Sequence, residues 1–207
     1  QRGNKHYVLI DTAGIRHRSK VSDSIEVFSV KRAEGSIGRA DLCCLVIDAE
    51  MGVTSQDQKI AGLIQEAHKP CIVVVNKWDL IREDAGSGDA LRDFIADQRA
   101  RLFFIDYAPF IMCSAKERSE MARLLNMIEK VRTGSRERIG TGVLNRALQD
   151  AIASHPPPMR SGRRFKILYA TQPERNPQDT IPAPEVVLFC NDGRLLDERY
   201  RRFCSGR

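Results

Sequence analysis

The order of apolar and polar positions predicts alternating strands and helices over the first two thirds of the chain. Apolar runs of strand length occur at 7–10, 42–48, 72–75 and 110–113. Between them, apolar residues recur every three or four positions, which is the spacing of one helix face. Strands that alternate with helices predict a parallel sheet with right-handed crossovers. We therefore expect an α/β sheet with helices on both of its faces.

Polar signals set the expected ends of these helices. A helical pattern runs from Ser24 to Ile37, after a basic and polar loop at 15–23. Another is expected to begin at Thr54 or Ser55, because either hydroxyl can cap the first turn. Further helices are expected through 91–98 and 121–131. The apolar stripe of the last one is interpreted as core packing.

The pattern changes after residue 135 and predicts a second, smaller α+β domain over 136–207. A helix is expected from Thr141 and should stop at His155, because three prolines follow and proline cannot continue a helix. Strands are expected at 165–169 and 186–189, separated by a proline-rich loop. A basic helix at 195–203 completes the order helix, strand, strand, helix.

Charge separates the two predicted domains. The whole chain has 207 residues and a net charge of +6. Residues 134–207 contain 13 Lys and Arg against 8 Asp and Glu, whereas residues 1–133 contain 20 against 19. A basic second domain fits an anionic partner such as RNA, and equally a solvated surface. The longest apolar runs fall well short of the roughly 20 residues that span a bilayer, so no membrane partner is expected.

Six cysteines occur, and none forms a C-x-x-C pair. Five of them lie in or beside apolar runs, so we expect buried free thiols in a reducing cytoplasm. The four histidines are scattered along the sequence, which gives no support to a metal site built on cysteine and histidine.

The strand at 72–75 ends in Asn76-Lys77-Trp78-Asp79, and this tetrad suggests a guanine site. Open α/β sheets bind ligands at the carboxyl ends of their strands. The Asp79 carboxylate can accept both the N1–H and the N2 amino group of guanine, a donor pair that adenine lacks. Asn76 can offer its amide to the base edge, and Lys77 can lie along the base plane. The alternative is a strand that ends in a solvated turn.

Two further strand ends carry polar residues that suit a nucleotide. The run at 7–10 leads into Asp11-Thr12-Ala13-Gly14. Asp11 could hold Mg²⁺ through its water shell, and Gly14 lets a backbone N–H approach a phosphate. The run at 110–113 leads into Ser114-Ala115-Lys116, whose backbone N–H groups could donate to guanine O6. Each motif alone could be a plain loop, but three converging on one sheet edge predict a guanine-nucleotide site.

These motifs resemble the third, fourth and fifth motifs of translation-factor-type P-loop GTPases. The resemblance is nearer still to the second GTPase domain of the bacterial EngA/Der tandem GTPases, and it covers nearly the whole chain. The segments that carry it are 11–16, 28–30, 46–49, 73–80, 155–158, 166–172 and 188–192.

The resemblance implies a P-loop-type domain over 1–135 and a KH-like domain over 136–207. It implies a cytoplasmic, monomeric protein that binds GTP or GDP with Mg²⁺, hydrolyses GTP and acts in large ribosomal subunit assembly. Asp11 would contact the Mg²⁺ shell, and Thr12, Ala13 and Gly14 the phosphates. The guanine pocket would consist of Asn76, Lys77, Asp79, Ser114, Ala115 and Lys116.

Three departures from the family pattern qualify these expectations. No G-x-x-x-x-G-K-[ST] loop occurs in the 207 residues, although that loop holds the phosphates in P-loop GTPases. Because that loop is missing, we expect the chain alone to be inactive. Because the chain begins with Gln1, we expect a fragment. Ile15 stands where many small GTPases place a water-orienting glutamine, so the catalytic group is unknown.

The third departure concerns RNA. KH domains usually grip nucleic acid with a GXXG loop, and none occurs in 141–207. Phosphate contacts could still come from arginines, and the candidates are Arg160, Arg163, Arg164, Arg201 and Arg202. The alternative function is a non-enzymatic RNA- or ribosome-binding module with an incomplete nucleotide site.

Overall fold

The computed structural model describes residues 6–11, 33–82, 88–160, 162–174, 181 and 184–205. It divides into two compact units, Gln1–Ile128 and Glu129–Arg207. Each unit is described here by itself.

The first unit contains a three-stranded parallel sheet. Its strands are β1 (Cys43–Asp48), β2 (Cys71–Asn76) and β3 (Phe110–Met112), in the order β1-β2-β3. The register pairs Asp48 with Asn76 and Val75 with Met112, so the carboxyl ends of all three strands meet at one edge. The expected parallel sheet is confirmed.

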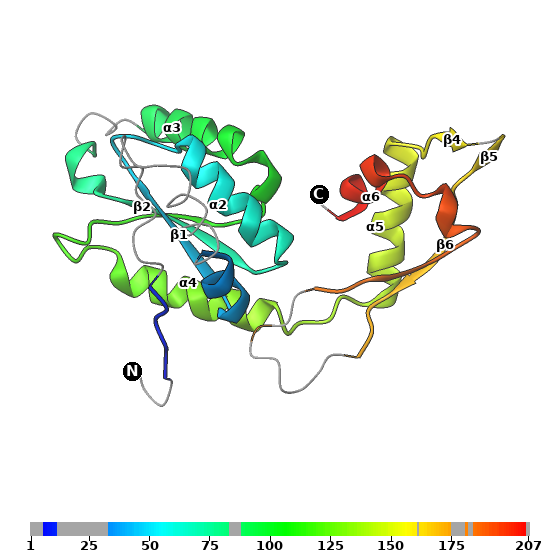
Figure 1. The fold of residues 1–207 in the computed structure, drawn as a ribbon, viewed down its shortest axis with the longest axis horizontal. Helices are drawn as coiled ribbons and strands as arrows, with labels where there is room; N and C mark the ends of the chain where they lie inside the picture. Colours follow the sequence, from blue (N-terminus) through cyan, green and yellow to red (C-terminus); the bar gives the residue numbers. More distant parts are fainter. Residues whose placement is uncertain are drawn as a thin grey trace. The chain divides into compact units, whose positions relative to one another are not determined.

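Helices lie on both sides of this sheet (Figure 1). They are α2 (Ser55–Glu66), α3 (Gly88–Arg101) and α4 (Met121–Gly134), and the described part of another covers 33–39. Two short 3₁₀ helices, η1 (Trp78–Leu80) and η2 (Phe103–Ile105), follow β2 and α3. Of the two residues expected to cap α2, Thr54 is the N-cap, and it also forms a capping box with Asp57 that was not predicted.

The core of the first unit is built around β2. Ile72, Val73 and Val75 are completely buried, as a strand enclosed on both faces requires. Burying each such side chain contributes about 1.5–3 kcal/mol. Side chains from 33–39, α2 and η2 pack into the same cluster, including Ile37, Ile64 and Ile105.

The strand expected at 7–10 is wrong. Residues 7–10 form no strand, and the side chains of Val8 and Leu9 are 88% and 95% exposed. Apolar composition favours a strand, but a strand also needs a ladder partner, and 6–11 pairs with no described strand. β1 is buried on one face only: Leu45 and Ile47 face the core, whereas Cys44 and Val46 are exposed.

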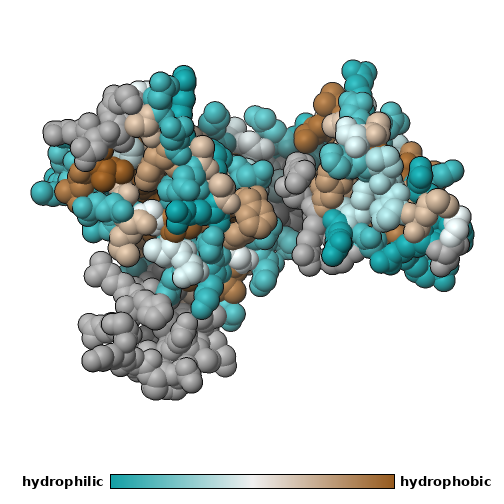
Figure 2. Space-filling model, turned by 90° about the horizontal axis from the view of Figure 1, so that it is seen from above, coloured by the Kyte–Doolittle hydropathy of each residue, from teal (hydrophilic) through white to brown (hydrophobic). Residues whose placement is uncertain are grey.

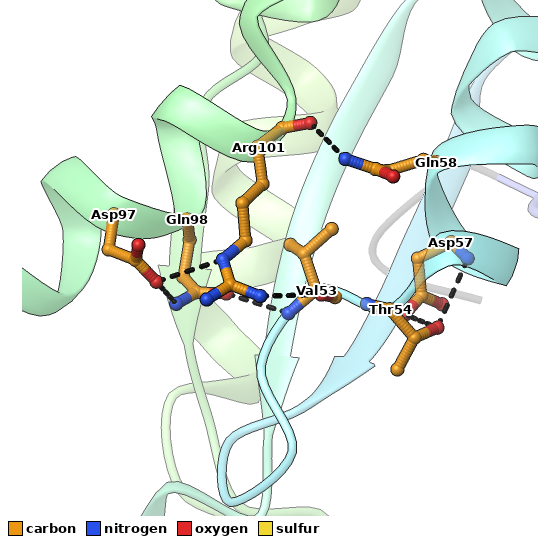
Figure 3. Close-up of polar contacts among 7 residues, drawn as sticks. All are labelled: Val53, Thr54, Asp57, Gln58, Asp97, Gln98 and Arg101. Carbon is orange, nitrogen blue, oxygen red and sulfur yellow. Dashed lines mark hydrogen bonds and ion pairs between the residues drawn. The ribbon is translucent and has the colours of Figure 1, made fainter.

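A buried glutamine of α3 forms a hydrogen bond with the loop that follows β1 (Figure 3). Gln98 is 4% exposed, and its Oε1 accepts the backbone N–H of Val53 at 2.7 Å. Arg101, one turn on, donates to the Val53 carbonyl and pairs with Asp97. Gly52 has φ +62°, and a Cβ there would meet Gln98 Oε1 at 2.8 Å. The loop therefore depends on this glycine and this glutamine together.

We predict that Gln98→Met lowers the free energy of unfolding by about 1–3 kcal/mol, because the buried N–H of Val53 loses its acceptor at nearly constant side-chain volume. Urea denaturation measures this loss. Gln58→Met is the matched control: Gln58 bonds the carbonyl of Arg101 at a more exposed position, where water can replace it. Equal losses in both variants would contradict the buried-acceptor account.

The second unit is a small α+β body. It contains α5 (Thr141–Ser154), β4 (Met159–Arg160), β5 (Arg163–Arg164), β6 (Ile167–Thr171), β7 (Val187–Cys190), η3 (Gly193–Leu195) and α6 (Glu198–Ser205). β6 pairs antiparallel with β7, and Phe165, Leu195 and Tyr200 form its core. Asn145 of α5 bonds both the N–H and the carbonyl of Ala170 at 2.8 Å, so its amide acts as an extra ladder partner.

The predicted order helix, strand, strand, helix is confirmed among the described residues, with two corrections. The short β4–β5 hairpin was not predicted, because its strands have two residues each and little apolar content. The helix expected at 195–203 is divided: η3 ends at Leu195, and α6 begins at Glu198. α5 ends at Ser154, just before His155, as predicted.

The cysteines are free, and Cys43, Cys71 and Cys113 are buried, whereas Cys44 is exposed. Burial raises the pKa of Cys43 to about 11 and that of Cys71 to about 12, which makes both thiols poor nucleophiles. Among the described residues, no His, Cys, Asp and Glu cluster suits a metal ion, and no helix is long and apolar enough to cross a membrane.

Candidate functional site

The carboxyl ends of the three strands are joined to one another by backbone hydrogen bonds. Ala49, after β1, donates to the carbonyl of Asn76 at 2.9 Å. Trp78, after β2, donates to the carbonyl of Cys113 at 3.0 Å. The side-chain oxygen of Asn76 then accepts the backbone N–H of Ala115 at 3.0 Å. The second and third predicted motifs are thereby brought together at one edge.

Lys77 adopts an unusual backbone conformation at this edge. Its φ of 63° and ψ of 30° lie in the left-handed region, which costs a residue with a side chain on the order of 1 kcal/mol. Its Nζ forms an ion pair with Asp48 Oδ2 at 2.5 Å, across the ends of β1 and β2. Hydrogen bonding to Lys77 is the largest influence that lowers the pKa of Asp48. This pair holds the lysine side chain beside the strand ends.

Asp79 has a buried oxygen that lacks a partner. Its Oδ1 is inaccessible to solvent and accepts no hydrogen bond from any described residue. The nearby hydroxyl of Ser114, with smaller contributions from Lys116 and Arg82, lowers the pKa of this carboxyl group. The group is therefore held in its charged form at neutral pH, with one acceptor that nothing in the described chain satisfies. Such an atom is costly unless a ligand donates to it.

The loop after β3 is held in a defined shape. Ser114 is 1% exposed, its N–H donates to Ser119 Oγ at 3.1 Å, and its own Oγ accepts the N–H of Glu117. The N–H of Ala115 is used by Asn76, so two of the three predicted N–H donors already have partners. The N–H of Lys116 has none among the described residues.

A surface ion pair connects the two loops of the site. Arg82, after η1, makes two bonds to the carboxylate of Glu117, at 2.9 and 3.2 Å. Trp78 of η1 also packs against Phe94 of α3, with ring centroids 5.7 Å apart. These two contacts together hold the turn that contains Asp79.

The first predicted motif is only partly visible. Asp11 is exposed at the end of the segment 6–11, while Thr12, Ala13 and Gly14 lie outside the described residues. The structure brings Asn76, Lys77, Asp79, Ser114, Ala115 and Lys116 to one edge and gives no position for the remaining part of the first motif.

Sequence reasoning missed Asp48, Arg82, Glu117 and Ser119. Asp48 had a recognisable signal, because it is a carboxylate directly after a buried apolar strand and beside the end of β2. The other three gave none, because charged and hydroxyl residues in polar loops are common.

Comparison with known proteins identifies the family. Residues 2–133 match the family described as the elongation factor Tu GTP binding domain. The chain belongs to that family. Residues 138–207 match the KH-domain-like, C-terminal region of EngA bacterial GTPase enzymes. The resemblance to the EngA/Der GTPases is thus confirmed.

Individual relatives agree. The chain is 47% identical over 203 residues to the GTPase Der of Akkermansia muciniphila, covering 97% of this chain and 44% of the relative. It is 43% identical over 207 residues to the GTPase Der of Symbiobacterium thermophilum, covering 100% of this chain and 42% of the relative. The chain therefore spans less than half the length of these curated relatives.

A solved structure of Aquifex aeolicus Era bound to GDP and aluminium fluoride aligns with a TM-score of 0.45 and 25% identity. The alignment covers 54% of this chain and 36% of that one.

We predict that Asp48→Asn lowers the free energy of unfolding at pH 7 by about 1 kcal/mol or less, since the ion pair with Lys77 is partly exposed. The folded pKa of Asp48 is lowered, so its contribution is complete above the unfolded pKa and disappears as pH falls through the folded value. Urea denaturation of both proteins from neutral to acid pH should show the difference shrinking toward zero.

The control is Asp89→Asn, which removes a pair with Arg92 at 3.6 Å between side chains that are 84% and 91% exposed. It should change stability little at any pH. A loss for Asp48→Asn that is independent of pH would contradict the ion-pair account.

Proposed function

We propose that this chain carries the guanine-binding part of a GTPase that acts in assembly of the large ribosomal subunit. The observation that supports this most strongly is the unpartnered, buried Oδ1 of Asp79. A charged acceptor at a strand end, without a donor in the described chain, suits the paired N1–H and N2–H donors of guanine. Adenine would leave it unsatisfied, which is how polar sites discriminate strongly.

The other base contacts follow from which groups remain available. Asn76 Oδ1 already accepts the backbone N–H of Ala115, so the Nδ2 group of Asn76 can donate to the base edge. The N–H of Lys116 is the remaining donor for guanine O6, with Ser114 and Ala115 shaping the loop. Lys77 lies along the base plane, and Asp48 positions it.

The phosphate half is proposed from sequence. Asp11 would contact the water shell of Mg²⁺, and Thr12, Ala13 and Gly14 the phosphates. The ion would neutralise phosphate charge when bound. Because the 207 residues contain no G-x-x-x-x-G-K-[ST] loop, we propose that this chain alone does not hydrolyse GTP. Ile15 offers no group that could align water, so no catalytic residue is assigned.

The second unit supplies the proposed contact with ribosomal RNA. The side chains of Arg160 and Arg164 are exposed, and their guanidinium groups have no partner among the described residues, so both are available to phosphates. Further candidates are Arg163, which lies 3.8 Å from Asp192, and the α6 residues Arg201 and Arg202.

We place the domain boundary at residue 135, just after α4, and propose a monomer in the cytoplasm.

A non-enzymatic RNA-binding module is the second candidate. The absent phosphate loop and the unpaired side chains of Arg160 and Arg164 in the β4–β5 hairpin favour it. RNA binding that falls steeply with salt and does not respond to guanine nucleotides would support it over the GTPase proposal.

We predict that Asp79→Asn reverses base preference from guanine to xanthine, because an amide can donate to the carbonyl at xanthine C2. Affinity for guanosine should fall and affinity for xanthosine should rise, each by about tenfold or more, because hydrogen bonds to a charged group are stronger than those between neutral groups. The indole N–H resonance of Trp78, the only tryptophan, reports titrations with guanosine and xanthosine.

Asp106→Asn is the matched control, because it removes an exposed carboxylate from the same unit. It should leave both affinities unchanged. Unaltered base preference in Asp79→Asn, with guanosine still bound, would refute the assignment of Asp79.

A further inference from the structure

The sheet of the second unit has one open face. Helices α5 and α6 lie on one side of it (Figure 1). Phe165 and Tyr200 are buried in one cluster, and Ala170 of β6 is completely buried. On the other side, Tyr169 and Phe189 are 46% and 52% exposed. They are direct partners in the β6–β7 register, and their ring centroids are 5.9 Å apart at an interplanar angle of 48°. Two neighbouring aromatic rings therefore stand on a face that no described helix covers.

Further apolar side chains enlarge this surface. Leu168 is 68% exposed and Val187 is 38% exposed, and both belong to the same two strands. Apolar residues reach the surface of this unit among hydrophilic ones (Figure 2). A sheet this small rarely exposes so many large apolar side chains without a binding role. We call the set Tyr169, Phe189, Leu168 and Val187 the open face.

Positive charge lies at one end of the open face. Arg164 and Lys166 flank the buried Phe165, and neighbouring side chains of an extended chain alternate, so both project away from the core. Both side chains are exposed, and neither charged group has a partner among the described residues. Asp192, which follows β7 at the same end of the sheet, is already bound by Arg194 at 3.0 Å and lies 3.8 Å from Arg163, and these arginines lower its pKa.

Two further acids lie at the opposite end of the sheet. Glu174 follows β6 and Glu185 precedes β7, so both are at the end away from Arg164 and Lys166. The open face thus has exposed aromatic rings at its centre and the unpaired side chains of Arg164 and Lys166 at one end. A chain that offers flat aromatic groups and a negatively charged backbone matches both features.

We propose that the open face binds single-stranded RNA, with bases stacked on Tyr169 and Phe189 and phosphates bound by Arg164 and Lys166. This proposal rests on the RNA partner proposed above and identifies the surface that it uses. The mode requires no GXXG loop, so it agrees with the absence of that loop from 141–207. Stacking on aromatic rings tolerates any base, so binding should depend little on sequence.

The test is fluorescence anisotropy of the 207-residue chain with a labelled single-stranded oligoribonucleotide of about twelve nucleotides. Tyr169→Leu combined with Phe189→Leu keeps the face apolar and removes the rings. We expect the dissociation constant to rise about tenfold or more. Phe103→Leu, which removes a 72% exposed ring from the first unit, should leave RNA binding unchanged.

Two further measurements separate stacking from simple charge attraction. A duplex of the same sequence should bind at least tenfold more weakly, because its bases are not available for stacking. Arg164→Gln and Lys166→Gln should each reduce the slope of log K against log salt by about 0.7. Circular dichroism of each variant verifies that the fold is retained.

The outcomes distinguish this proposal from the proposed function. RNA binding that the double aromatic variant leaves unchanged would overturn the open-face site while keeping the RNA partner. No RNA binding at low salt would overturn both. If the double variant instead abolished self-association in sedimentation, with RNA affinity unaltered, the face would be a contact between copies and the RNA site would be refuted.

Discussion

The site depends on the pairing of β2 with a parallel neighbour on each side. This strand is almost entirely buried, and its backbone is bonded to β1 and β3 up to their carboxyl ends. A shift of one residue would turn its side chains to the opposite faces and separate Asn76 from both neighbours. The hydrophobic core therefore sets the register, and the register sets the positions of Asp48, Asn76 and the loop at 114–116. The same hydrogen-bond ladders therefore determine both the packing of the core and the arrangement of the proposed guanine site.

Much of this arrangement could be predicted from sequence, because buried strands and helix faces leave strong periodic signals. β2 and the polar residues after it were found from a β-branched run that ends in Asn76. The exposed segment 7–10 shows the limit of that reasoning: apolar composition indicates a strand, but the partner that would complete its ladder is a non-local property. The bond from Ala115 to Asn76 and the left-handed backbone of Lys77 are also non-local, since both depend on how strand ends meet.

The two units divide the chemistry between them. The first presents a carboxylate with one unpartnered, inaccessible oxygen and a defined loop, which suit selective recognition of a neutral base edge. The second presents exposed rings and unpaired cations, which suit a flexible polyanion and little selectivity. The sequence already indicated this division, because positive charge is concentrated in the second unit. It could not show which of the cationic side chains lack partners. That distinction requires side-chain contacts, because Arg194 and Arg164 look alike in composition and differ in their access to a ligand.

The central claim is that three strand ends form a base-selective guanine site, and nucleoside titration tests it most directly. The indole resonance of Trp78 would be followed with guanosine, adenosine and GTP with Mg²⁺. The account predicts that guanosine binds at least tenfold more tightly than adenosine, because only guanine satisfies Asp79 Oδ1. It also predicts that GTP binds little more tightly than guanosine, since this chain lacks the phosphate loop. Equal affinity for guanosine and adenosine would contradict the claim.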